Sequence, residues 1–490
     1  MKHIINYHKW DKKESTIFTK SLRNILHIIE PQLYFPIMSL FFYIHNTPNS
    51  HRLIDFKREH YIKEIINHRN LKEYNSNIMA SCKIYNKCSN KEELIEVFGK
   101  VIPLLDPIHY LLNNYNISTH RNPMIPSNYS FNTYSKINDI NNMAYIDTFF
   151  SYLASQITDQ DKNPSFPIYY GSVNGMNDYK YDISEDIDEL KNHKGFNKLL
   201  NNISLEAFTD TDYNSSNSSS NSSSNSSSNS SSNSSYTTSS ADSDIDDCIV
   251  TIKRMPVLYL FIEKLEGTLE DIIKSELSLP LLRSCLFQVS FALIYLQKHL
   301  FFTHNDLHIN NIMYTSTDKP FLYYKYNNQY FKIPTYGKLF KIIDFGRSIF
   351  TFRKKTYMND VFSKYGEAEG QYTHPPQVSF LQTDYKDMVY PSYHFDLCRL
   401  AITMLDEIRY NHDDELEDND DYQDFLEFLK YLVTDKNGKR LDKEEDNFDL
   451  YIIISKNAQN SLPRDIIINK FFHEYRVKKK NFPKSTYYSI

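Results

Sequence analysis

The decisive stretch of this chain reads His304-Asn305-Asp306-Leu307-His308-Ile309-Asn310-Asn311, which follows the pattern H-x-D-L-x-x-x-N. A second stretch, at residues 341–346, reads Lys-Ile-Ile-Asp-Phe-Gly, an apolar strand that ends in the triplet D-F-G. Either stretch alone could arise by chance, but together they specify seven residues in a fixed order. The two stretches therefore predict a single site for phosphoryl transfer.

The residue types in these stretches suit that chemistry, which depends on positioning and charge neutralisation more than on covalent help. Asp306 is the candidate catalytic residue, because its carboxylate can accept or orient the proton of an acceptor hydroxyl. Asn311 would share a Mg²⁺ ion with Asp344 across the phosphates of ATP. His304 and Phe345 are more typical of packing residues. We expect ATP and Mg²⁺ as cofactors.

A candidate phosphate-binding lysine lies upstream. Val97-Phe98-Gly99-Lys100 is similar to the strand motif V-A-I-K, in which the lysine grips the α- and β-phosphates. A surface lysine on an ordinary strand is the alternative interpretation. The acidic partner expected for Lys100 is Asp147, on a helix predicted from the spacing of apolar residues over Met143–Ile157.

A continuous apolar run, Val257–Ile262, predicts a buried strand that leads into the turn Glu263–Glu266. Further elements expected from apolar patterning are a hairpin of Ile78–Tyr85 with Leu94–Ile102, and a long helix over Leu281–Leu300.

Composition limits the function classes. The hydrophobic share is 41%, the formal net charge is −6, and the five cysteines form no C-x-x-C pair. These values favour a globular protein of a reducing compartment, with no nucleic-acid-binding stripe and no zinc site. The N-terminal residues are polar, and the most apolar run, Leu33–Ile44, is short and contains Pro36. We expect a soluble intracellular protein without a membrane segment.

The motifs resemble the protein kinase superfamily, and the stretch from His304 to Ser348 is most similar to its haspin branch. The similarity includes Asp-Leu-His in place of Asp-Leu-Lys in the catalytic loop and the inserted Ile333–Gly337 before the metal-binding Asp344. It also includes Phe395–Arg399, in which an Asp would anchor the catalytic loop, and the lack of an A-P-E triplet. The resemblance implies an α+β, bilobal protein kinase-like fold, with a small β-rich N-lobe and a larger helical C-lobe. It also implies that the backbone of Glu263 and Leu265, in the turn after Val257–Ile262, meets the adenine ring of ATP; an ordinary buried strand and turn is the alternative.

This resemblance divides the chain. Residues 1–70 are expected to form an N-terminal helical extension, and residues 71–204 an atypical N-lobe. Residues 205–248 contain a Ser/Asn repeat and an acidic run, which predict a disordered insertion because they offer little to bury. Residues 249–490 would complete the N-lobe and supply the hinge and the C-lobe.

Two departures leave alternatives open. No glycine-rich loop precedes Lys100, and Asn305 replaces the usual arginine before the catalytic Asp306. The leading prediction is an ATP- and Mg²⁺-dependent serine/threonine protein kinase, with activity that does not depend on activation-loop phosphorylation. A pseudokinase scaffold that binds nucleotide or partners without transfer is the first alternative. A small-molecule phosphotransferase is the second, because such enzymes share the H-x-D-x-x-x-x-N loop.

The biased composition and the Asn/Ser repeat are similar to proteins of giant DNA viruses of amoebae, some of which are haspin-like kinases. That similarity implies a viral protein located in the host cytoplasm or the virion. The haspin resemblance also implies histone tails as one class of protein substrate, although nothing in the residues identifies the substrate.

Overall fold

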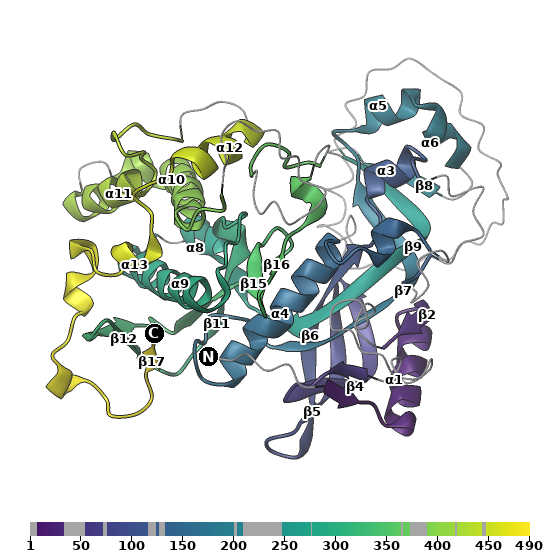
Figure 1. The fold of residues 1–490 in the computed structure, drawn as a ribbon, viewed down its shortest axis with the longest axis horizontal. Coiled ribbons are helices and arrows are strands. Elements are labelled where there is room, and N and C mark those ends of the chain that lie inside the picture. The colour runs from purple at the N-terminus through teal and green to yellow at the C-terminus, as the bar shows by residue number, and fades with distance from the viewer. Residues whose placement is uncertain are drawn as a thin grey trace, which may run out of the picture.

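We describe a computed structural model of the chain over residues 7–33, 54–71, 76–115, 124–126, 133–199, 203–208, 247–275, 277–363, 366–372, 390–416, 419–442 and 447–490. Helices and strands are mixed, which confirms the expected α+β class. Seven of the strands form one large sheet, most of the longer helices lie beside it, and α4 runs between the two groups (Figure 1).

The large sheet has seven strands, and every pairing in it is antiparallel. Its order is β2-β7-β9-β6-β5-β4, with β8 also paired to β9. The members are β2 (Ile29–Gln32), β4 (His60–Asn70), β5 (Ile78–Asn86), β6 (Lys91–Pro103), β7 (Tyr169–Asp182), β8 (Ile203–Phe208) and β9 (Asp247–Glu263).

Strands β5 and β6 form the predicted hairpin, with Ile78 opposite Gly99. A Cβ on Gly99 would lie 2.7 Å from Ile78 Cγ1, so the close approach of the two strands requires glycine there. The predicted apolar strand Val257–Ile262 is the end of β9, which pairs with β6 so that Lys100 faces Leu260 across the ladder. The central position of β6 therefore places Lys100 on a well-supported strand.

Helix α4 (Met143–Asp159) confirms the helix expected over Met143–Ile157. It begins at Asn142, whose side chain accepts a hydrogen bond from Ala144 N and donates one to Leu104 O. The spacing of apolar residues predicts an amphipathic helix, but every residue from Ala144 to Ser155 is buried, so α4 has no exposed face over this range. The reason is its position between the sheet and the C-terminal part of the chain (Figure 1).

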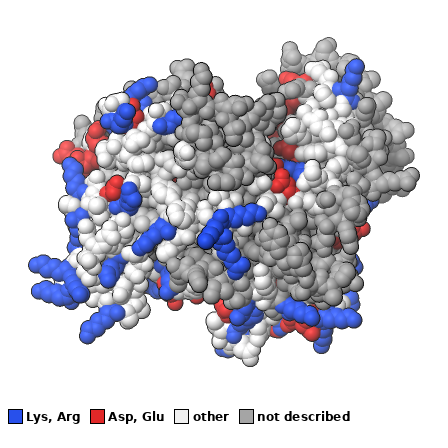
Figure 2. Space-filling model, viewed as in Figure 1, with Lys and Arg blue, Asp and Glu red and all other residues white. Residues whose placement is uncertain are grey.

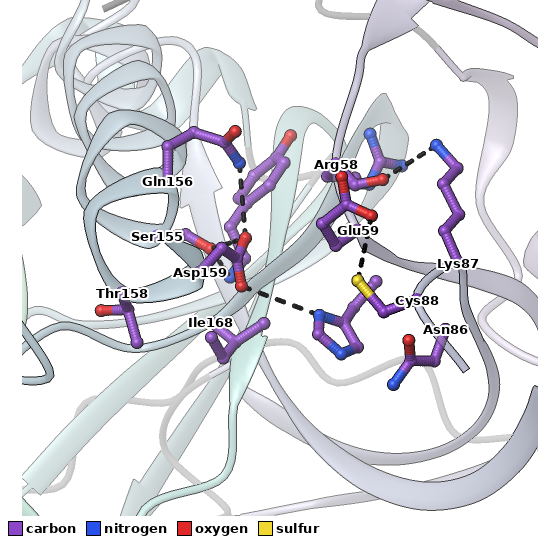
Figure 3. A network of polar contacts seen from close by, with 12 residues as sticks. Arg58, Glu59, Asn86, Lys87, Cys88, Ser155, Gln156, Thr158, Asp159 and Ile168 are labelled. Atoms are coloured by element: carbon purple, nitrogen blue, oxygen red, sulfur yellow. Dashed lines mark hydrogen bonds and ion pairs between the residues drawn. The ribbon is translucent and has the colours of Figure 1, made fainter. Parts of the chain in front are cut away.

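A polar network ties the end of α4 to the sheet (Figure 3). Asp159 Oδ1 lies 3.8 Å from His60 Nδ1 on β4, and Gln156 Nε2 donates to Asp159 Oδ2 at 3.4 Å. Beside it, Cys88 Sγ contacts Glu59 Oε2 at 3.5 Å. The contact of Asp159 with His60 links the C-terminal end of α4 to β4, and that of Cys88 with Glu59 links the β5–β6 turn to the residue before β4.

The C-terminal part is built around α9 (Leu279–Leu300), which matches the long helix expected over Leu281–Leu300. Helix α9 is the one described helix long and apolar enough to cross a membrane, and 83% of its most apolar window is buried inside the fold. This burial is consistent with the core helix of a soluble protein. The other helices of this part are α8 (Leu269–Ser275), α10 (Phe395–Leu416), α11 (Asp420–Leu432), α12 (Asn447–Asn457) and α13 (Pro463–Ile466).

Short sheets hold the motif loops between α9 and the large sheet. In one of them β11 pairs with β14, so the residues just after the catalytic loop lie beside the strand that leads into Asp344. The short strands are β10 (Gly267–Thr268), β11 (Ile312–Ser316), β14 (Lys338–Ile342), β12 (Phe321–Tyr326), β13 (Gln329–Pro334), β17 (Tyr488–Ser489), β15 (Phe350–Phe352) and β16 (Lys355–Tyr357).

The expected helical extension over residues 1–70 is wrong. Its described residues contain one helix, α1 (Lys12–Asn24), together with β1 (Tyr7–Lys9), β2, β3 (Ile54–Phe56) and β4. The buried residues of β4 are Tyr61, Ile62 and Ile65, a spacing that fits one face of a helix, whereas the chain there forms an edge strand paired with β5. Of the expected insertion at residues 205–248, residues 209–246 lie outside the described residues.

The remaining helices are α3 (Pro107–Leu111), α5 (Ile187–Asn192) and α6 (Lys194–Leu199), which lie beyond one end of the large sheet (Figure 1). On the face drawn in Figure 2, basic side chains gather at the corner formed by the short helix η9 (Lys479–Asn481). A second group of basic side chains lies near the middle of this face, and acidic and basic side chains mix along its edges (Figure 2).

Candidate active site

Lys100 lies between two carboxylates that come from distant parts of the chain. Its Nζ is 2.7 Å from Asp147 Oδ2 on α4 and 2.8 Å from Asp344 Oδ1 in the D-F-G triplet. The side chain of Asp147 is 2% exposed, that of Lys100 is 25% exposed and that of Asp344 is 43% exposed. The structure therefore brings together three of the predicted site residues, and Asp147 is the acid that pairs with Lys100.

The three groups of this cluster differ in how strongly their charged forms are favoured. Burial opposes the charge on Lys100, but the two carboxylates outweigh it and raise the pKa of Lys100. Burial also opposes the charge on Asp344, yet Lys100 lowers its pKa to about 2. Burial and the nearby Asp344 raise the pKa of Asp147. Asp344 is therefore the firmly ionised carboxylate, and it is also the most exposed of the three groups.

Asp344 adopts a left-handed backbone conformation, with φ of 62°. Left-handed geometry is uncommon for residues other than glycine, and Asp and Asn tolerate it better than most. The next amide, Phe345 N, donates to Asp147 Oδ1 at 3.1 Å, which links the triplet to α4. Phe345 itself packs on Phe150 of α4 and on His304, with ring centroids 4.7 and 5.7 Å apart. His304 and Phe345 are thus packing residues, as predicted.

The candidate catalytic loop, residues 304–311, is anchored by a buried carboxylate on α10. Asp396 accepts hydrogen bonds from His304 N, at 2.9 Å to Oδ2, and from Asn305 N, at 3.0 Å to Oδ1. His304 Nε2 in turn contacts Ile343 O at 2.9 Å. The anchoring role that the resemblance implied for an Asp in Phe395–Arg399 therefore agrees with these contacts.

Asn305, which replaces the expected arginine, is fully buried and has a φ of 64°. Its Nδ2 donates to Arg347 O at 3.0 Å, and its Oδ1 accepts from the Tyr372 hydroxyl at 2.7 Å. Asn305 therefore connects the catalytic loop to the segment after the D-F-G triplet through uncharged hydrogen bonds.

The loop closes on itself near its end. Asn311 Nδ2 donates to Asp306 O at 2.9 Å and lies 3.0 Å from His308 Nε2. Ile343 N donates to Asn311 O at 3.1 Å, so Asn311 lies beside the residue that precedes Asp344. The backbone of Asn311 therefore lies next to the strand that leads into the D-F-G triplet.

Two cavities divide the predicted site residues. A cavity of about 150 Å³ is lined by Lys100, Asp147 and Asp344, with an apolar wall that includes Phe98 and Ile262. A second cavity of about 430 Å³ is lined by Asp306 together with other polar residues, among them Arg347, Arg399, Tyr451, Asp406 and Glu407.

Glu263 and Leu265 do not line the cavity that holds Lys100. The carboxylate of Glu263 instead accepts from Lys341 Nζ at 2.6 Å and from Ile168 N at 3.0 Å. Leu265 is half-buried between β9 and β10. The adenine contact predicted for these two residues runs through their backbone, and it stays a prediction.

Sequence reasoning missed Tyr451, Arg347 and Arg399, which surround Asp306. Tyr451 lies far from Asp306 along the chain and is one of 39 tyrosines, so no motif marks it. The signal for the two arginines was their position, three residues after Asp344 and three residues after Asp396.

No protein-family model matches this chain, and no curated protein matches it significantly. Among the described residues, no group of three or more His, Cys, Asp or Glu side chains is arranged to hold a metal ion. Any assignment of function therefore depends on the residues described above.

Proposed function

We propose that this chain is an ATP- and Mg²⁺-dependent serine/threonine protein kinase with a haspin-like, bilobal fold. The observation that carries the proposal is the contact of Lys100 with both Asp147 and Asp344, at 2.7 and 2.8 Å. In protein kinases a strand lysine pairs with an acid on the neighbouring helix, while the D-F-G aspartate holds the metal. Lys100, on a strand, and Asp147, on α4, fit the first pair, and Asp344 fits the third role.

The donor set fits a magnesium ion that keeps most of its ligands from water and phosphate. Mg²⁺ is commonly bound by one or two protein oxygens together with substrate phosphates. Asp344 offers an ionised and 43% exposed carboxylate. Asn311 uses its amide nitrogen for the two contacts described above, so its amide oxygen is the atom that would bind the metal.

The residues of this chain would divide the work as follows. Lys100 would neutralise the α- and β-phosphates, and Asp147 would orient Lys100. ATP with its metal supplies the transferable phosphoryl group. Asp306 would accept the proton of the acceptor hydroxyl, and Asp396 would hold the loop that carries Asp306 in place.

Label transfer from radiolabelled ATP to a histone mixture, and to the protein itself, tests this proposal. Wild type should transfer label with Mg²⁺, and Asp344→Ala should abolish the transfer. Asp318→Ala is the matched control, because Asp318 is exposed in the turn after β11. Equal transfer by wild type and Asp344→Ala would rule out the assigned site.

A nucleotide-binding pseudokinase is the second candidate. Its support is that the β4–β5 connection, where a phosphate-covering loop would lie, contains no glycine, and that Lys100 already occupies the Asp344 carboxylate. This candidate predicts that ATP with Mg²⁺ raises the melting temperature of wild type although no label is transferred.

A further inference from the structure

A tyrosine hydroxyl contacts the candidate catalytic carboxylate. The Oη atom of Tyr451, on α12, donates a hydrogen bond to Asp306 Oδ1 at 2.6 Å. Burial, with the nearby Asp306 carboxylate, raises the pKa of Tyr451, so the hydroxyl is protonated at neutral pH and remains a donor. A hydroxyl that donates to the catalytic carboxylate is the contact that a phosphate acceptor would make before transfer.

Two arginines hold the ring of Tyr451. The guanidinium carbon of Arg399 lies 5.1 Å from the ring centroid and that of Arg347 lies 5.9 Å from it. Phe395 packs against the same ring, with centroids 5.9 Å apart. Contacts of guanidinium groups with an aromatic face at these distances are attractive. The ring is therefore held by several groups, and its hydroxyl is aimed at Asp306.

The holding groups belong to the same segments that build the candidate site. Arg347 follows the D-F-G triplet, and Arg399 lies one turn after the anchoring Asp396 on α10. Both arginines, Tyr451 and Asp306 line the cavity of about 430 Å³. Tyr451 thus stands inside the cavity through which an acceptor would reach Asp306.

We propose that Tyr451 occupies the acceptor position on Asp306 as an internal mimic of the substrate hydroxyl, and that an acceptor must displace it. This proposal rests on the proposed kinase function. It makes Tyr451 a residue that controls acceptor binding, while ATP binding at Lys100 and Asp344 is independent of it. The alternative is a purely positioning role, in which Tyr451 holds Asp306 while the acceptor uses the other carboxylate oxygen. In that case removal of the Tyr451 hydroxyl would slow transfer and would not improve acceptor binding.

The first test separates acceptor binding from turnover. Tyr451→Phe removes the hydroxyl and keeps the ring between the arginines. The histone concentration at half-maximal transfer should fall by roughly tenfold, as expected for loss of a competing hydrogen bond to a charged group, while the KM for ATP stays unchanged. A lower kcat with an unchanged acceptor KM would overturn the proposal in favour of the positioning role. Tyr410→Phe is the matched control, because Tyr410 on α10 is 88% exposed.

The second test does not require activity. Carbodiimide labelling of carboxyl groups, read by peptide mass spectrometry, measures how accessible Asp306 is in the full-length protein. Tyr451→Ala should label Asp306 several-fold more than wild type, with Asp318 as the internal reference. Equal labelling of Asp306 in the two proteins would overturn the proposal. If neither wild type nor any variant transfers label, the kinase function is refuted. The carbodiimide labelling of Asp306 would still decide whether Tyr451 covers that carboxylate.

Discussion

Asp147 and Lys100 form a nearly buried ion pair, with 2.7 Å between Asp147 Oδ2 and Lys100 Nζ. The pair joins the N-terminal half of α4 to the central strand β6 of the sheet. Because Asp147 also accepts from Phe345 N, the same carboxylate connects the sheet, the helix and the D-F-G triplet. A change at Asp147 should therefore be felt in both stability and the geometry of the site.

Replacing Asp147 by Ala should lower the free energy of unfolding by about 2 kcal/mol, because hydrogen bonds to charged groups are lost from a buried position. Asp147→Asn should cost less, since its side-chain oxygen can still accept from Phe345 N. Urea unfolding of both variants measures the difference. Equal stability of Asp147→Ala and wild type would mean that Asp344 alone satisfies Lys100.

Removal of the Asp396 carboxylate should loosen the catalytic loop. Asp396→Ala leaves two buried backbone amides, those of His304 and Asn305, without acceptors. The expected loss is about 3 kcal/mol of unfolding free energy, since each buried amide without a partner costs ~1–3 kcal/mol. Hydrogen exchange at the two amides should rise sharply, and exchange that stays slow would contradict the anchoring role. Asp406→Ala on the same helix is the control.

The aromatic contact between α4 and the catalytic region should also be strong. Phe150 is fully buried and stacks on Phe302, with ring centroids 4.4 Å apart. Phe150→Ala should lower the free energy of unfolding by about 4 kcal/mol, because it removes a large buried ring and leaves a cavity. Phe150→Leu should lose less than half as much. Chemical denaturation of the two variants checks this order, and similar losses would show that the cavity collapses.

The network at the end of α4 predicts a pH dependence. The carboxylate of Asp159 raises the pKa of His60 above its ordinary 6.5. A raised histidine pKa contributes stability that is complete below the unfolded value and is lost as the pH rises through the folded value. Wild type should therefore lose stability between about pH 5.5 and about pH 8.5 more steeply than His60→Gln. Urea unfolding at the two pH values provides the comparison, and parallel profiles would exclude a contribution from His60.

Several elements could be predicted because their signals are local. Apolar spacing located α4 and α9, and the alternation around the turn at Asn86 located the β5–β6 hairpin. The pairing of Lys100 with Asp147 followed from a strand motif and from an acidic residue on the next helix that the sequence predicts. Strand β4 was not predicted, because its strand conformation depends on its pairing with β5. The burial of α4 on all sides was not predicted either, because it depends on the elements that pack around the helix.

The sequence by itself determined which groups could carry phosphoryl-transfer chemistry, because Asp306, Asn311 and Asp344 stand at fixed spacings within two short stretches. Only the tertiary structure decided what surrounds them. The hydrogen bond of Tyr451 to Asp306 and the hydrogen bonds of Asp396 to the loop join segments that are distant in the chain. The packing of the strands also decides that Glu263 does not line the Lys100 cavity. Such contacts depend on how helices and strands pack against each other, and the local order of residues does not specify which distant segments meet.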